Sequence, residues 1–157
     1  MSIPTFKHKQ LDIPDSWTIH KNDFLDLEPD NSFPIDEVFH HFDEDILNAT
    51  SNDYCIDLGF LGSYLNDRKG FFKIVVFKGG FHNAEFFELF ISRSTDEIRD
   101  KLNLYFKAIP TGQLDNIKGF KYDDNFDHST FYVYSALDKT DHRLTNQELE
   151  EISSPKK

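Results

Sequence analysis

The stretch from Tyr54 to Ile109 constrains the fold most, because it reads as three strands and a helix in direct succession. Apolar residues alternate with other types over 54–60, which is the period of a half-buried strand. The β-branched and aromatic run at 71–77 predicts a second strand, and 85–92 predicts a third. The short, turn-rich connections between them favour antiparallel neighbours in a meander.

A helix over residues 94–109 follows the third strand. Ser94 and Glu97 have the spacing of a capping box, in which each side chain bonds the other residue's backbone amide. Pro110 stops the helix. Apolar residues recur at helical spacing and predict one buried stripe of Ile98, Leu102, Tyr105, Phe106 and Ile109. This stripe is expected to cover an apolar face of the sheet.

A second covering helix is predicted to begin near Pro34, since proline is tolerated in a first helical turn. Its expected inner stripe comprises Val38, Phe39, Phe42, Ile46 and Leu47. Residues 48–53 are predicted to break this helix before the first strand. The fold class that follows is α+β. It is a single-layer antiparallel sheet of at least three meander strands, four or five in all, covered by two main helices.

The chain of 157 residues is expected to form one domain over 1–157. Its core is predicted at 33–110, with a C-terminal extension over 111–152 packed on it and a frayed end at 153–157. In the extension, short strands are expected at 120–122 and 130–137, and Thr145 with Glu148 predicts a capped short helix. The single Trp17 is interpreted as a core residue, with a partner contact as the alternative.

Acidic residues are concentrated in the N-terminal third. Of the net charge of −11, residues 1–57 hold −10, because 13 acids there face only Lys7, Lys9 and Lys21. Such a block repels nucleic acid and anionic membranes and attracts basic partners; plain solubility is the alternative reading. The chain shows no apolar run of about 20 residues and no secretory leader. With the lone Cys55, these features predict a cytoplasmic protein.

No pattern of catalytic or ligand-binding residues emerges from the sequence. Adjacent His40 and His41 should point about 100° apart on a helix, and neither HExxH nor CxxC occurs, so no metal site is expected. The acidic run 123–127 lacks the glycine and final glutamate of a calcium loop. Cys55 lies within a predicted strand and reads as an inert buried thiol. We therefore predict no catalysis, no catalytic residues and no cofactor.

The order and the amino-acid sequences of the central strands resemble those of a known protein family. Residues 56–60 read Ile-Asp-Leu-Gly-Phe, 62–64 read Gly-Ser-Tyr, and 70–76 read Gly-Phe-Phe-Lys-Ile-Val-Val, ahead of a third strand and the helix at 94–98. This pattern over roughly 50–110 resembles the small acidic immunity proteins of bacterial toxin systems, especially those of contact-dependent growth inhibition. The resemblance implies a cytosolic protein that binds and blocks one cognate toxin C-terminal domain, often a nuclease.

The leading hypothesis is therefore an immunity protein that neutralises a basic toxin domain through an acidic surface. It predicts no direct contact with nucleic acid or membrane and leaves the oligomeric state open. The expected partner-binding residues are acids of the N-terminal third and of one later loop: Asp23, Asp26, Glu28, Asp36, Asp43, Glu44, Asp45, Asp123, Asp124 and Asp127. Aromatic neighbours would supply desolvated anchors.

Two other classes stay open. One is a small α+β enzyme or ligand-binding domain with a pocket between sheet and helices, for which Tyr54, Tyr64, His82 and Tyr105 are the candidate lining residues. A deep cleft with converging polar groups would favour it. The other is a scaffold or adaptor, which the sequence does not separate from the immunity hypothesis.

Overall fold

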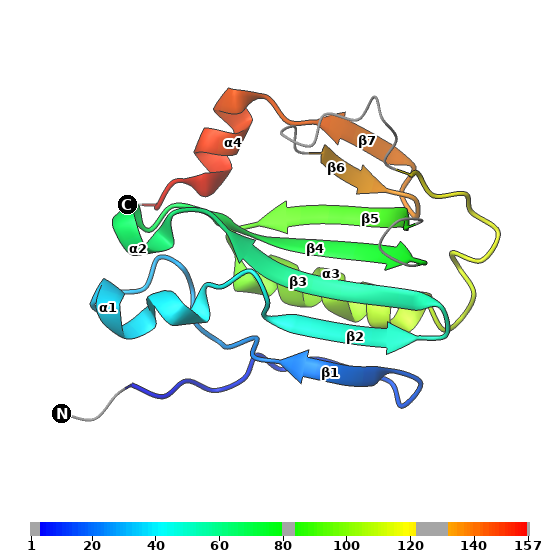
Figure 1. Ribbon diagram of the computed structural model, residues 1–157, viewed down its shortest axis with the longest axis horizontal. Coiled ribbons are helices and arrows are strands. Elements are labelled where there is room, and N and C mark those ends of the chain that lie inside the picture. The colour runs from blue at the N-terminus through cyan, green and yellow to red at the C-terminus, as the bar shows by residue number, and fades with distance from the viewer. Residues whose placement is uncertain (1–3, 80–83, 122–131, 157) are drawn as a thin grey trace.

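A computed structural model of the protein describes residues 4–79, 84–121 and 132–156. Within these residues a seven-stranded antiparallel sheet runs in sequence order from β1 to β7 (Figure 1). The strands are β1 Thr18–Asn22, β2 Leu47–Ser51, β3 Tyr54–Leu61, β4 Phe71–Lys78, β5 Glu85–Ser92, β6 Tyr132–Ser135 and β7 Thr140–Arg143. The helices are α1 Ile35–Val38, the 3-10 helix η1 Phe39–His41, α2 Tyr64–Asp67, α3 Thr95–Ala108 and α4 Asn146–Ser153.

The predicted meander is confirmed at the centre of the sheet. β3 pairs with β4 from Tyr54 opposite Lys78 to Leu61 opposite Phe71, and β4 pairs with β5 in the same antiparallel sense. The expected strand at 130–137 corresponds to β6 in its described part. At 120–122, Phe120 forms only an isolated bridge with Phe86, and Tyr122 lies outside the described residues.

The second covering helix was predicted wrongly. Only the four residues of α1 and the three of η1 are helical, and Leu47 begins strand β2. Residues 48–53 do not break a helix: they complete β2 and turn into β3 at Asn52, which has a φ of 55°. Four members of the predicted inner stripe are buried, but Phe39 is 37% exposed. Pairing with β3 overrides the helical period of the apolar residues.

α3 covers one face of the sheet, as predicted. Its Ile98, Leu102, Tyr105 and Phe106 are buried against the inward residues of β3 and β4. Only one of the two hydrogen bonds of the predicted capping box forms. Ser94 Oγ accepts the Glu97 amide at 3.2 Å, but the Glu97 carboxylate accepts a bond from Ser92 Oγ at 2.9 Å instead of the Ser94 amide.

α4 covers part of the opposite face. Leu149 and Ile152 pack with a second cluster that contains Phe71 and Ile91. Neighbouring residues of a strand point to opposite faces, so this cluster lies across the sheet from buried Phe72. The predicted capping box of Thr145 and Glu148 is complete. The fold is thus α+β but dominated by its sheet, with one long and one short helix on opposite faces rather than two main helices covering one layer.

Trp17 is a core residue, as interpreted, with 6% of its surface exposed. Its indole Nε1 donates to the Phe106 carbonyl oxygen at 2.8 Å, and the two rings meet edge to face. This contact ties the start of β1 to α3. In the described part of the chain, no helix has both the length and the apolar character needed to cross a membrane.

Candidate partner-binding site

Backbone pairing brings three of the predicted acids together. Residues 43–46 continue the pairing along β3, since Phe60 N donates to Asp43 O at 2.7 Å and Ile46 N donates to Leu58 O at 2.9 Å. The Asp23 amide then donates to Ile46 O at 2.8 Å. Asp23 and residues 43–46 are about 20 positions apart in the sequence. These bonds place them side by side, next to the second half of β3.

We call the space between these segments the acidic hollow, and its volume is about 340 Å³. Leu25 and Ile46 contribute its apolar lining. Its charged and titratable residues are Asp23, Asp43, Asp45, Lys21, His8, His40 and His41. With neutral histidines, three carboxylates face one ammonium group, and the hollow carries a net charge of −2.

Lys21 neutralises only part of this charge. Its Nζ lies 3.3 Å from Asp45 and 3.8 Å from Asp23, and both carboxylates stay about two-thirds exposed. Asp43 accepts the Glu44 amide at 2.7 Å. Asp36, Asp43 and Glu44 are all exposed, and none forms an ion pair with a residue that the structure describes. These acids remain available to a cationic partner.

Asp26 and Glu28 lie elsewhere and serve the fold. Asp26 pairs with the buried Lys9 at 3.1 Å, and Lys9 also pairs with Asp96 at 2.6 Å. Burial alone would lower the pKa of Lys9, but the hydrogen bonds and charges of Asp96 and Asp26 outweigh it and raise that pKa. Glu28 accepts from both the amide and the hydroxyl of Thr95. Both acids therefore help to hold the N-terminal segment against the start of α3.

Asp123, Asp124 and Asp127 lie outside the described residues, so their relation to the acidic hollow is a prediction only.

A row of aromatic rings runs beside the acidic hollow. Phe6 meets Phe33 edge to face at 5.1 Å and His41 at 5.6 Å. His41 lies 4.0 Å from His40, whose ring is 5.9 Å from that of Phe39. Contrary to the expectation that they point apart, the two histidine rings are neighbours. Phe33 and Phe39 are 38% and 37% exposed, so large apolar side chains border the acids.

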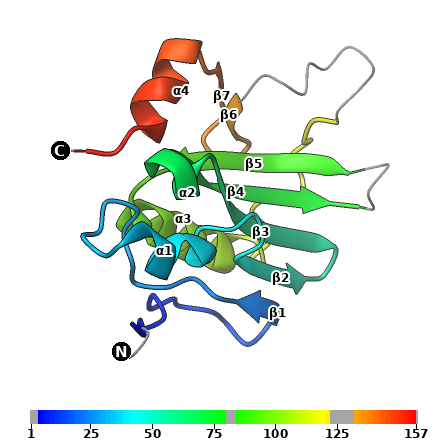
Figure 2. The ribbon, with the colours of Figure 1, turned by 60° about the vertical axis from the view of Figure 1, so that its left-hand side comes forward.

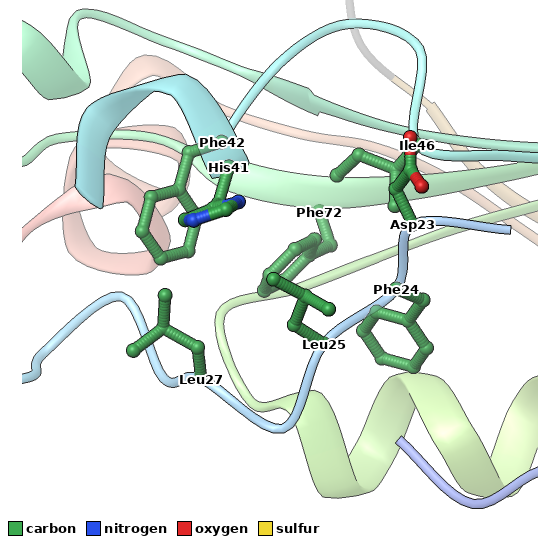
Figure 3. Close-up of a pocket in the computed structure, with 8 residues that line it drawn as sticks. All are labelled: Asp23, Phe24, Leu25, Leu27, His41, Phe42, Ile46 and Phe72. Atoms are coloured by element: carbon green, nitrogen blue, oxygen red, sulfur yellow. The ribbon is translucent and has the colours of Figure 1, made fainter. Parts of the chain in front are cut away.

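The floor of the acidic hollow is tightly packed. A small cavity shares Asp23, Leu25, His41 and Ile46 with it (Figure 3). Its remaining lining residues are Phe24, Leu27, Phe42 and Phe72. Its volume is about 10 Å³, which is room for roughly one water molecule. The hollow is thus a surface feature and does not continue into the core as a ligand pocket.

The loop that carries α1 and η1 is fixed to α2. Arg68, at the end of α2, donates to the carbonyl oxygens of Asn31 and Phe33, and the Tyr64 hydroxyl donates to Pro29 O at 2.7 Å. α1 and α2 lie at the same end of the sheet (Figure 2). These bonds hold exposed Phe33 in a defined position.

The alternative pocket between sheet and helices has little support. Tyr54 bonds Asp115 at 3.2 Å, Tyr64 is committed to Pro29, and Tyr105 is 1% exposed within the core. His82 lies outside the described residues. Hollows of about 330 and 280 Å³ flank α4, and none of these tyrosines lines them. Among the described residues, no group of three or more His, Cys, Asp or Glu is placed to hold a metal ion.

Cys55 is half-buried, and burial raises the pKa of its thiol. A raised pKa keeps the thiol protonated at neutral pH, and this fits an inert residue.

Sequence reasoning missed the buried charges. Arg93 donates to Gly70 O at 2.9 Å and Ser153 O at 3.3 Å, and it pairs with Asp30 at 2.6 Å. Glu88 and Lys9 are likewise buried. The neighbouring sequence does not reveal that Glu28 binds the first turn of α3 or that Glu88 is buried in β5. The partner of each, Thr95 and Ser135, lies more than 45 residues away in sequence.

Comparisons of the chain with protein-family models, with curated proteins and with solved structures found no match.

Proposed function

We propose that this protein binds and neutralises a basic toxin domain, in the manner of bacterial immunity proteins, with no catalysis of its own. The contact surface consists of the acidic hollow, the exposed acids Asp36 and Glu44, and the aromatic row that ends in Phe33 and Phe39. The observation that carries the proposal is the convergence of Asp23, Asp43 and Asp45 from two segments of the chain. Lys21 is the only lysine among the described residues that line the hollow.

Charge and aromatic residues would act together at this surface. A toxin that binds nucleic acid presents lysine and arginine, and complementary charge speeds its capture. Charge alone gives little affinity at an exposed surface. Exposed phenylalanines beside the acids supply apolar area that a partner can desolvate, which is typical of binding hot spots.

The test is co-purification with the toxin domain encoded by the adjacent open reading frame. The variant D43K/E44K/D45K reverses two charges that line the hollow and the exposed Glu44 between them. The control D15K/D53K/D141K makes the same change in net charge at exposed acids that do not line the hollow. We expect the first variant to lose the toxin domain and the control to retain it.

Two results would contradict the proposal. Retention of the toxin domain by D43K/E44K/D45K would exclude the hollow as the main contact. Equal loss in both variants would show that only overall charge matters. Affinity of the wild type should also fall as salt is raised.

A further inference from the structure

Three histidines line the acidic hollow from two segments of the chain. His8 comes from the N-terminal segment, and its Nε2 lies 3.0 Å from Asn22 O. His40 and His41 come from η1. Histidine is the side chain whose charge ordinarily changes between pH 5 and 8. Three such residues at one site can change its charge within that range.

The sign of the net charge of the acidic hollow depends on these three histidines. Among the described residues, the other charged groups that line the hollow are Asp23, Asp43, Asp45 and Lys21. Protonation of all three histidines changes the net charge of the hollow from −2 to +1.

From this arrangement we infer that His8, His40 and His41 form a pH-dependent gate on the proposed contact surface, which holds a cationic partner above pH 7 and releases it near pH 5. The inference rests on the proposed function, since it concerns the regulation of the same surface.

The histidine pair supports this inference by its position. His40 and His41 have ring centroids 4.0 Å apart, and His41 also packs on Phe6. Burial and the charge of His40 lower the pKa of His41, while the charge of Asp23 opposes them. His41 therefore gains its charge at a lower pH than a free histidine does, and pH 5 is the appropriate lower limit for a test.

A fluorescent deca-arginine peptide serves as the cationic probe, titrated against the full chain at pH 8 and at pH 5. A unit charge about 6 Å from a bound cation changes affinity roughly threefold at the dielectric constant of water, so three charges predict a weakening of roughly thirtyfold. The variant H8Q/H40Q/H41Q should lose most of this pH dependence. The control H20Q/H142Q changes histidines outside the hollow and should behave as the wild type.

An NMR titration of the wild-type histidines gives a second, mutation-free measurement. Linkage is reciprocal, so a bound cation must lower the proton affinity of the same groups that weaken its binding. Saturating peptide should lower the titration midpoints of His8, His40 and His41 and leave those of His20 and His142 unchanged.

The possible failures separate the two proposals. The pH-dependent gate is wrong if the peptide binds equally well at pH 8 and pH 5. It is also wrong if the triple glutamine variant keeps the pH dependence. Neither result contradicts the proposed contact surface. If the peptide does not bind at pH 8, the gate fails together with the hollow as a cation-binding surface.

Discussion

Replacing Glu88 by glutamine should stabilise the protein at pH 8 and leave it almost unchanged at pH 4.5. Glu88 lies in β5, opposite Ser135 of β6, and only 1% of its surface is exposed. Its carboxyl group accepts bonds from Ser135 Oγ at 2.9 Å and from the Ala136 amide at 2.8 Å. Glutamine can occupy the same place, because its oxygen accepts from Ala136 N and its amide donates to Ser135 Oγ.

The magnitude follows from the pKa of Glu88. Burial raises this pKa from 4.5 to about 7, against the two hydrogen bonds and the charge of Lys101. Below pH 4.5, both the folded and unfolded chains are protonated at this residue. Between 4.5 and 7 only the unfolded chain ionises, so the free energy of unfolding falls as pH rises. Above pH 7 the accumulated loss is constant, at about 3 kcal/mol.

Urea unfolding between pH 4.5 and pH 8 measures this effect, with the fluorescence of buried Trp17 as the probe. The difference in unfolding free energy between E88Q and wild type should grow by about 3 kcal/mol across this range. Histidines titrate in both proteins and cancel in the difference. The control E44Q removes an exposed carboxylate, so its difference should stay nearly flat. Parallel curves for E88Q and wild type would refute the reasoning.

Two further substitutions test how the N-terminal third is held. G59A places a Cβ 2.1 Å from the Glu44 carbonyl oxygen, so it should cost about 1 to 3 kcal/mol and displace the acidic segment, while C55A on the same strand should cost less in urea unfolding. K9M removes the bonds of Lys9 to Asp26, Thr95 and Asp96 and should cost about 1 to 3 kcal/mol. Exposed K7M should be nearly neutral, and equal stabilities of K7M and K9M would contradict this role.

Local patterns predicted the parts of the fold that depend on neighbours in sequence. β3, β4 and β5 follow from alternation, and α3 follows from its cap and stripe. β2 did not, because residues 47–51 have no pattern of their own strong enough to outweigh the apolar spacing before them. Their strand state comes from pairing with β3. β7 is exposed throughout and shows no apolar alternation either.

The candidate site was predicted in composition but not in geometry. Sequence could mark the acids of the N-terminal third as a group, yet nothing local separates Asp23, which lines the hollow, from Asp26, which pairs with Lys9. That separation depends on a lysine 17 residues before Asp26 and on a helix 70 residues after it. The sequence pattern raises His40 and His41 only as possible metal ligands, and it gives no sign that they and His8 lie beside the acids.

The same contacts explain why the acids of the hollow can remain free. The bonds from Lys9 to Asp26 and from Thr95 to Glu28 hold the N-terminal segment against α3. The ion pair of Arg93 with Asp30 joins this segment to the end of α4, because Arg93 also donates to Ser153 O. The fold therefore needs these three acids for its own stability. It holds the backbones of Asp23 and Asp43 through Ile46 and Phe60. Their carboxylates meet the Lys21 ammonium group and the Glu44 amide and stay exposed. Because backbone pairing leaves the carboxylates exposed, substitutions such as D43K should change binding far more than folding, and this makes the acidic hollow testable by mutation.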